Sequence, residues 1–431
     1  MEWQISGLIF FFLLIGLLVA GVWIAVALGM VGVIGLLLVD PSSLRGVGVI
    51  VWDTLDSFVL TAVPLFFFMG SLILHSGISS RFYKSLSMWL DHVPGSLAHS
   101  NIVACSLFAA ISGSSVATAA AIGAIALPEM EKRGYDRALT YGSLAAGGTL
   151  GILIPPSIPF IIYGAMIGES IGRLFIAGVI PGIVLSGIFV VYIGIRTLLN
   201  PQLIPRREIH VAWRERLSGL VDLVPIFFLM FLILGGIYFG IATPTEAAAI
   251  GVVGAILVAW VYKQLNWRVL KASLSEAIKA NSMILFIVVG AQIMSYAMVT
   301  AGIPRAIVAV ITGLQVEPLT IFLLICVMYL ILGCLMDALS LMLLTLPVVY
   351  PVMMALGYDA IWFGVVLVIL LEVGLITPPV GMNLFVIQGM ARQPLSIVAR
   401  GSFPYVILML ILLALLTLYP QLALWLPAKM M

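Results

Sequence analysis

An uncharged, apolar run extends from Ile5 to Val39, near the start of the chain. As one helix, these 35 residues would be about 52 Å long, whereas the hydrocarbon core of a bilayer is about 30 Å thick. We therefore predict two membrane-spanning helices in this run, with a tight break near Gly21.

The composition extends this prediction to the rest of the chain. Of the 431 residues, 63% are hydrophobic and only 9% are charged, whereas a soluble domain is about 45–50% apolar and about 25% charged. So few charges could not cover the surface of a soluble protein of this size, so lipid must contact much of it. The net charge of +2 gives no case for nucleic-acid binding. The cysteines and histidines show no disulfide or metal-ligand spacing.

Apolar segments of spanning length recur along the chain. Two amphipathic stretches between them, 79–93 and 267–277, carry several charges and are predicted to lie at the membrane interface. Further spans are predicted around 55–78, 137–168, 174–196, 218–240, 245–262, 276–300, 360–390 and 400–419.

The chain also contains an internal repeat at an offset of 223 residues. Gly134-Tyr135-Asp136 recurs as Gly357-Tyr358-Asp359. At the same offset, without a gap, Pro128 matches Pro351, Gly151 matches Gly374, Pro155-Pro156 matches Pro378-Pro379, Gly178 matches Gly401, and Pro181 matches Pro404. We therefore predict two copies of one unit, 4–197 and 217–425, joined by a polar linker at 198–216.

The distribution of Lys and Arg predicts how the two copies are oriented. The linker is the most basic loop, so it should be cytoplasmic. If each unit crosses five times, the second copy is inverted relative to the first. The loops inside the cell then hold every Lys and Arg except Arg45, Arg173, Arg305 and Lys429. Inverted repeats are typical of secondary transporters.

One segment in each copy should break a helix inside an apolar span. The first, 147–159, contains three glycines and three prolines, and the second is the matching segment 374–383. Such sequences cannot continue a regular helix, and unwound backbone at membrane depth must face protein or a polar cavity. Its carbonyls can hold a cation, and the N-termini of half-helices can face an anion. A packing kink without a ligand is the alternative, but a matched pair favours binding.

A second element in each copy is an apolar segment interrupted by small or polar residues. In 95–130 the interruption is Ser112-Gly113-Ser114-Ser115, followed by Thr118. The long apolar arms predict a re-entrant hairpin with its polar tip at mid-depth, although small residues also favour close helix packing. The equivalent segment, 318–355, is interrupted at 333–337.

Three carboxylates lie in apolar surroundings. Asp337 ends the second interruption, and an ionisable group inside a membrane is a functional hypothesis by default. Glu372 and Glu246 could instead be structural hydrogen-bond partners. That interpretation is favoured for Glu246, because Thr243 or Thr245 would cap a helix that begins there.

These motifs resemble the large permease subunit of TRAP transporters, the DctM type. The resemblance rests on the Ser-Gly-Ser-Ser, Pro-Glu-Met, Gly-Tyr-Asp and Gly-Ile-Leu-Ile-Pro-Pro-Ser blocks within 112–183, and on 243–249 and 374–383. It covers nearly the whole chain. It implies sodium-coupled uptake of an organic acid such as a C4-dicarboxylate, sialic acid or another sugar acid. It also implies an elevator-type carrier, in which a domain with both hairpins and both broken helices moves against a scaffold.

The resemblance further implies two partners, a small four-helix membrane subunit and an extracytoplasmic substrate-binding protein, and therefore a bacterial inner membrane. The small subunit is expected as a separate polypeptide. Three rivals are a channel, an intramembrane enzyme, and a binding-protein-independent, ion-coupled carboxylate carrier of a related fold. No filter motif or ring of like charge favours a channel, and no Ser/His or paired-Asp constellation favours an enzyme.

The predicted fold is an all-α polytopic membrane protein, an inverted repeat of two five-crossing units that each hold a re-entrant hairpin and a broken helix. We expect sodium and substrate to bind where the hairpin tips meet the broken helices. No cofactor other than sodium as coupling ion, and no catalytic residue, is expected. The candidate binding residues are Ser112, Gly113, Ser114, Ser115, Thr118, Gly151, Pro155, Pro156, Ser157, Gly333, Asp337, Gly374, Thr377, Pro378, Pro379, Gly381 and Asn383.

Overall fold

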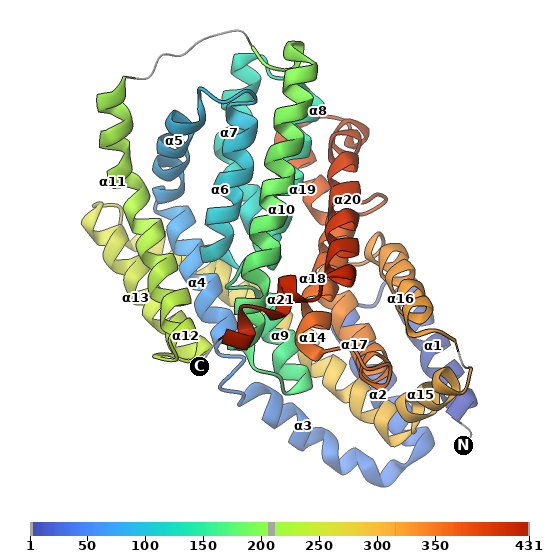
Figure 1. Ribbon diagram of the computed structural model, residues 1–431. Coiled ribbons are helices and arrows are strands. Elements are labelled where there is room, and N and C mark those ends of the chain that lie inside the picture. The colour runs from blue at the N-terminus through green and yellow to red at the C-terminus, as the bar shows by residue number, and fades with distance from the viewer. Residues whose placement is uncertain (1–2, 206–211, 315, 430–431) are drawn as a thin grey trace.

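The computed structural model describes residues 3–205, 212–314 and 316–429, and all regular elements in these ranges are helices (Figure 1). Before the linker these are α1 (Trp3–Val19), α2 (Ile24–Val39), α3 (Arg45–Leu55), α4 (Ala62–His75), α5 (Ile78–Leu90), α6 (Leu97–Ser112), α7 (Ser115–Arg133), α8 (Arg137–Leu153), α9 (Ile158–Ile167) and α10 (Ile171–Leu199). After it follow α11 (Trp213–Met230), α12 (Gly236–Tyr238), α13 (Pro244–Val261), α14 (Trp267–Thr300), α15 (Ile303–Gly313), α16 (Pro318–Gly333), α17 (Ala338–Ala355), α18 (Ala360–Leu375), α19 (Met382–Ala391), α20 (Leu395–Leu418) and α21 (Gln421–Leu424).

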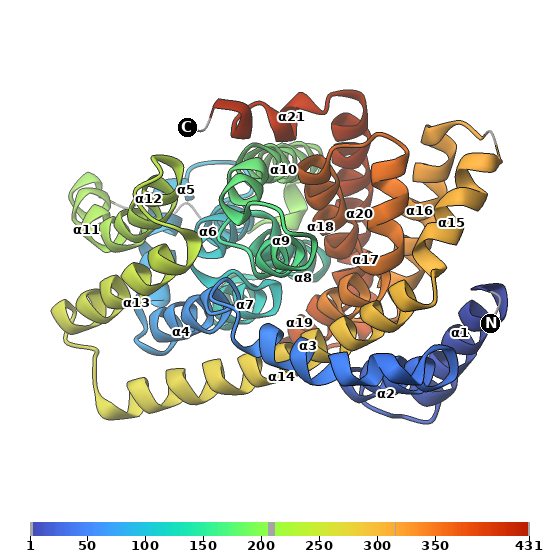
Figure 2. The same cartoon turned by 90° about the horizontal axis from the view of Figure 1, so that it is seen from below.

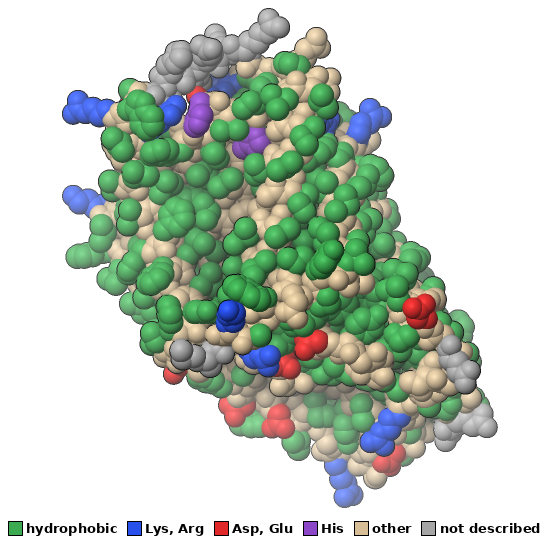
Figure 3. All heavy atoms as spheres, viewed as in Figure 1, with side chains coloured by type: hydrophobic (Ala, Val, Ile, Leu, Met, Phe, Trp, Pro, Cys, Tyr) green, Lys and Arg blue, Asp and Glu red, His purple; other side chains and the backbone are tan. Residues whose placement is uncertain are grey.

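Many of these helices have the length and composition of membrane spans. Within the described residues, seven stretches qualify: α8 with α9, α10, α11 with α12, α13, α14, α17 and α20. The pair α4 and α5, bent by 69°, would add an eighth. Hydrophobic side chains cover most of the face in Figure 3, and charged side chains lie mainly toward its two ends. The protein is therefore a multi-pass, all-helical membrane protein.

Local sequence signals predicted several helix ends correctly. Gly21 adopts a φ of +78° between α1 and α2, so the predicted break in the first apolar run is confirmed. At the start of α13, Thr243 Oγ1 accepts a hydrogen bond from Glu246 N at 3.3 Å, while the Glu246 carboxylate accepts one from Thr243 N at 2.8 Å. This reciprocal cap confirms the structural interpretation of Glu246.

Two predicted segments need correction. The span around 55–78 is divided, because α3 ends at Leu55 and α4 begins only at Ala62. The stretch 267–277 is not a separate element but the start of α14, which continues unbroken for 34 residues. Asn266 caps this helix by accepting a hydrogen bond from Val269 N at 3.0 Å. The stretch consists largely of good helix formers, so its charges do not end the helix.

The helices form two packed groups, one built on α14 and the other on α8 and α18, which contact each other. The long helix α14 packs along α2 and α4, and α4 also packs along α13. Figure 2 shows α14 along one edge of the molecule, with α8 and α9 near the centre. Helix α8 contacts α6, α7 and α20, while α18 contacts α16 and α17.

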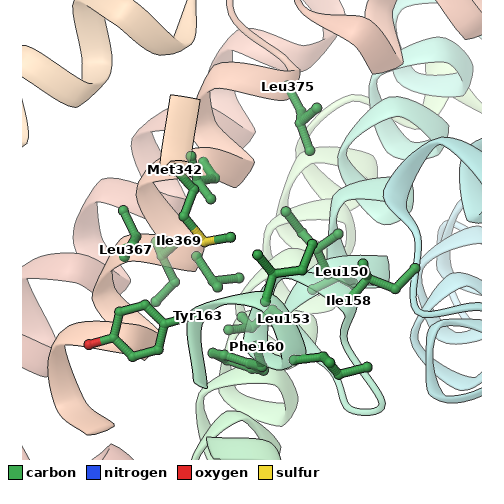
Figure 4. Close-up of a cluster of buried hydrophobic side chains, with 14 of the residues drawn as sticks. Leu150, Leu153, Ile158, Phe160, Tyr163, Met342, Leu367, Ile369 and Leu375 are labelled. Carbon is green, nitrogen blue, oxygen red and sulfur yellow. The ribbon is translucent and has the colours of Figure 1, made fainter. Parts of the chain in front are cut away.

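Both parts of the chain contribute to one apolar core. All fifteen residues of α18 from Ile361 to Leu375 are buried, as are their neighbours in α8. The cluster in Figure 4 joins Leu150, Leu153 and Phe160, from before the linker, with Met342, Leu367 and Ile369, from after it. Burial of these side chains fixes α8 and α18 beside each other.

Helices α8 and α20 cross with their backbones in contact. A Cβ atom at Gly142 would lie 2.2 Å from the carbonyl oxygen of Gly401, and one at Gly401 would lie 2.2 Å from that of Ala138. Any larger residue would push the helices apart, because both contacts are to backbone. Glycine at these two positions therefore allows a helix from before the linker and a helix from after it to pack backbone against backbone.

Candidate functional site

The first hairpin turns between α6 and α7. Gly113 ends α6 with a φ of +61°, and Ser114 caps α7 by accepting a hydrogen bond from Ala117 N at 3.4 Å. Behind the turn, Ser112 Oγ lies 2.6 Å from Thr118 Oγ1, which donates to the Ser114 carbonyl at 2.8 Å. Several oxygen atoms are thereby gathered at the tip.

The two arms of this hairpin run antiparallel. At the end away from the tip, Leu97 N donates to Tyr135 Oη at 3.4 Å, so the start of α6 lies beside the end of α7. The second arm continues through Pro128 to Arg133, further than the 130 predicted from the sequence.

The second hairpin has the same construction in α16 and α17. Asp337 caps α17 by accepting a hydrogen bond from Ser340 N at 3.0 Å. Tyr329 Oη, in α16, lies 2.5 Å from Thr345 Oγ1, in α17, and this contact holds the arms together. Asp337 is only half-buried. Its carboxylate therefore caps α17 and is also accessible at the hairpin tip.

Both predicted helix breaks are present. The first separates α8 from α9, where Ser157 caps α9 by accepting from Phe160 N at 3.5 Å and donates to the Ile152 carbonyl. The second separates α18 from α19, where Gly381 has a φ of +54°. The peptide bonds Pro155-Pro156 and Pro378-Pro379 are both cis. Just after the end of α18, Thr377 Oγ1 donates a hydrogen bond to the Val373 carbonyl in the last turn of that helix, at 2.6 Å.

Each hairpin tip is bonded to the break in the same half of the chain. Ile158 N donates to the Gly113 carbonyl at 3.3 Å, and Val380 N donates to the Cys334 carbonyl at 3.0 Å. A pair of matched glycines allows these approaches. A Cβ at Gly151 would lie 2.6 Å from the Ser114 carbonyl oxygen, and one at Gly374 would lie 2.8 Å from that of Gly333.

A cavity of about 380 Å³ lies where both tips and both breaks meet. Four helices contribute their first residue to its lining: Ser115 of α7, Ile158 of α9, Ala338 of α17 and Met382 of α19. Helix N-termini carry unpaired N–H groups and a partial positive charge. The tips and breaks therefore make this part of the cavity favourable for an anion.

The remaining wall of the cavity comes from α4 and α14, and it holds residues that the sequence analysis missed. Glu276 lines the cavity, and its Oε2 accepts a hydrogen bond from Ser71 Oγ at 2.5 Å. His75 Nε2 lies 2.9 Å from the same oxygen. The unbroken helix-forming sequence after 267 could have placed Glu276 in a long helix, but no local signal places α4 beside it.

The predicted site residues are only partly brought together. Five of them line the cavity: Ser112, Gly113, Ser114, Ser115 and Asp337. Others support the tips or breaks from behind without lining it: Thr118, Gly151, Pro155, Pro156, Ser157, Gly333, Gly374 and Gly381. Thr377, Pro378 and Pro379 belong to the second break and also lie outside the lining. Asn383 is fully buried and bonded to Ser115.

Glu372 lies apart from this cavity, in the middle of the packed core. It is fully buried in α18, and neither carboxyl oxygen has a hydrogen-bond partner within the described residues. Its counterpart at the repeat offset is Thr149 of α8, which donates to the Ala146 carbonyl at 2.8 Å. The alternative of a structural hydrogen-bond partner therefore has no support at Glu372.

Comparison with known proteins agrees with this architecture. Residues 11–422 match the family described as "Tripartite ATP-independent periplasmic transporter, DctM component". The chain is 38% identical over 407 residues to the C4-dicarboxylate TRAP transporter large permease protein DctM of Pseudomonas aeruginosa, with 93% of each chain covered. It is 32% identical to the sialic acid TRAP transporter large permease protein SiaM of Vibrio cholerae, with 96% of each covered.

Two further proteins bear on organisation and fold. The isethionate TRAP transporter permease protein DctMQ of Oleidesulfovibrio alaskensis is 33% identical, and the match covers 94% of this chain but 63% of that protein. The solved structure of the Alcanivorax borkumensis YdaH transporter is similar in fold, with a TM-score of 0.61, 15% identity, and 91% and 90% of the two chains covered. With its broken helices and central cavity, the chain thus belongs to the DctM family of TRAP transporter large permease subunits and is a transporter component, not an enzyme.

Proposed function

We propose that this subunit performs sodium-coupled uptake of an organic acid across a bacterial inner membrane. The observation that carries the proposal is the cavity into which both hairpin tips and both helix breaks converge. Four helix N-termini there suit a carboxylate. The relatives, described as transporters of C4-dicarboxylates, sialic acid and isethionate, support an organic anion as the substrate class.

Sodium is proposed to bind beside the substrate, at the C-terminal ends of the helices that stop at the tips and breaks. The oxygen-rich turn of Ser112, Ser114 and Thr118 supports one such site, because hard cations take oxygen ligands. In the other half, the buried Asn383 Oδ1 has no hydrogen-bond partner within the described residues. Backbone carbonyls near Gly374 would complete that second site.

The two units, 4–197 and 217–425, are proposed to be inverted copies with five crossings each. The order of helices supports the duplication: α6 to α10 start within two residues of positions 223 before the starts of α16 to α20. The linker 198–216 is proposed to be cytoplasmic. Its basic residues Arg206 and Arg207 lie outside the described residues, so this part of the proposal rests on the sequence.

The transport cycle is proposed to be of the elevator type. The hairpins, the broken helices α8–α9 and α18–α19, and α20 form one connected body, supported by the crossing at Gly142 and Gly401. Helices α2, α4, α13 and α14 pack against one another and would form the scaffold. Movement of the body against α4 and α14 would open the cavity to one side or the other.

Two partners are proposed, a small four-helix membrane subunit and an extracytoplasmic binding protein. The family is one component of a tripartite transporter. The match to DctMQ covers only 63% of that protein, and its remaining part supports a further membrane component that works with the large permease.

The test is uptake into liposomes that contain this chain and the small subunit, with the binding protein added outside. Labelled succinate, sialic acid and gluconate serve as probes, with and without an inward sodium gradient. We expect saturable uptake of at least one acid that needs both the gradient and the binding protein. Equal uptake without the binding protein would favour the related binding-protein-independent carrier. Flux that neither saturates nor needs sodium would indicate a channel.

A further inference from the structure

The cavity has walls of different electrostatic character. The wall formed by the tips and breaks presents four helix N-termini, which favour negative charge, and one carboxylate, Asp337, which already caps α17. The wall formed by α4 and α14 presents the carboxylate of Glu276. An anion can therefore be stabilised at one wall and is repelled at the other.

Hydrogen bonds hold the Glu276 carboxylate at this wall. Both donors, Ser71 and His75, reach Oε2, at 2.5 and 2.9 Å. Oε1 has no such partner within the described part of the chain, so it remains available to accept from a hydroxyl group of a ligand. Lys279, one turn further along α14, is exposed and forms no ion pair with Glu276.

The other described lining residues provide no positive charge to pair with a second carboxylate. Among the described residues that line the cavity, the charged ones are Glu276 and Asp337, and none is Lys or Arg. Most of the remaining surface is apolar and includes Phe67, Leu74, Phe108, Met283, Leu339 and Leu375.

A dicarboxylate would meet a penalty in such a cavity. With one carboxylate at the helix N-termini, its second would face either apolar side chains, where an unpaired charge is costly, or the half-exposed Glu276 carboxylate, which repels it. Sodium ions bound at the tips and breaks would add their positive charge to that wall and not to the wall that carries Glu276, so they would not remove this repulsion. An acid with one carboxylate and a neutral body avoids the penalty.

We propose that this cavity selects an organic acid that has a single carboxylate and an uncharged body, and that Glu276, positioned by Ser71 and His75, excludes a second carboxylate. The inference rests on the proposed function, because it takes the cavity as the substrate site. It narrows the substrate class to monocarboxylates such as sugar acids, in contrast to the C4-dicarboxylates named for one relative.

The experiment uses this chain purified with its small subunit, in nanodiscs at saturating sodium. Two pairs of six-carbon acids serve as probes: hexanoate with adipate, and gluconate with glucarate. Each pair differs by one carboxylate at constant chain length. Binding is measured by the concentration dependence of the thermal shift. We expect the dicarboxylate of each pair to bind about tenfold more weakly than its partner, and the Glu276→Gln variant to reduce this ratio to about twofold.

Glu276→Gln keeps the shape of the side chain and an oxygen that can accept from Ser71, so the fold should be retained. Glu317→Gln is the matched control, because it removes the same charge at an exposed position far outside the cavity lining. It should leave both ratios unchanged. If dicarboxylates bind the unmodified protein as tightly as monocarboxylates, the selectivity inference is overturned but the proposed function is not. An unchanged affinity ratio between the two acids of a pair in Glu276→Gln has the same consequence. A thermal shift with none of the acids and none with sodium would overturn the proposed function as well.

Discussion

Asn383 of α19 donates a hydrogen bond to Ser115 Oγ, 2.8 Å away in α7, although the two residues are 268 positions apart in the chain. The same amide nitrogen donates to the Ala145 carbonyl of α8 at 3.1 Å. The second helix break is thereby bonded to the tip of the first hairpin and to the first broken helix. A contact of this kind joins the two halves of the proposed site.

Replacing Asn383 by Ala should destabilise the protein by about 1–3 kcal/mol, because Ser115 Oγ and the Ala145 carbonyl would lose a buried donor. Thermal melting of the purified protein measures the effect. Asn200→Ala is the control, since Asn200 is exposed and its side chain makes no hydrogen bond within the described residues. Equal melting temperatures for the two variants would contradict a bonding role for Asn383.

Gly151→Ala and Gly374→Ala should each lower stability by about 1–3 kcal/mol and reduce uptake, because the new methyl group would press on the backbone of a hairpin tip. Gly187→Ala provides a matched control in α10, where a Cβ has open space. That variant should melt at the same temperature or slightly higher, since Ala favours the helix. The close approach of tip and break would be unimportant if all three alanine variants behaved alike.

The inverted orientation predicts that equivalent positions lie on opposite faces of the membrane. Lys132 and Ala355 are both exposed and are 223 residues apart, close to the two Gly-Tyr-Asp turns. Single cysteines there, in a variant lacking Cys105, Cys326 and Cys334, are labelled with an impermeant maleimide in intact and in opened cells. Only the Ala355→Cys protein should react in intact cells. Reaction of both from the same side would exclude the inverted repeat.

Ser112→Ala should raise the sodium concentration for half-maximal uptake by about tenfold, since one oxygen is removed from the first tip. Maximal uptake at high sodium should remain near normal, which separates loss of an ion ligand from misfolding. Thr300→Val removes a hydroxyl from the end of α14 and should leave the sodium dependence as it is. An unaltered sodium requirement in Ser112→Ala would remove that side chain from the ion site.

Glu372→Leu should stabilise the protein by about 1–3 kcal/mol, because an apolar side chain of similar size replaces a buried carboxyl group without a partner in the described residues. At the matching position, Thr149→Val should have a smaller effect, since Thr149 already satisfies its hydroxyl. Thermal melting and sodium-dependent uptake are measured together. Normal folding with lost uptake would instead give Glu372 a part in ion coupling.

The sequence predicted those parts of the fold that depend on local chemistry. Glycine, proline and hydroxyl side chains decide where a helix stops or starts, so the break at Gly21, the cap at Thr243 and the interruption at Ser114 could be read directly. Asp337 lies at the second interruption, as the sequence indicates, but its capping of α17 was not predicted, and its binding role stays a prediction.

The wall of the cavity could not be predicted in the same way. Glu276 lies in a stretch whose charges are typical of an interfacial helix, and only packing against α4 brings it beside Ser71. Thr377 stays a prediction: its oxygen suits a cation, and in the structure its hydroxyl donates to the Val373 carbonyl, outside the cavity lining. Local composition does not determine which distant helix packs against a given segment.

The crossing of α8 and α20 at Gly142 and Gly401 has a consequence for how such a protein can be assembled. If the gene were divided within the linker, each fragment would carry a bare backbone groove whose complement lies on the other fragment. Neither should accumulate in cells unless both are produced together.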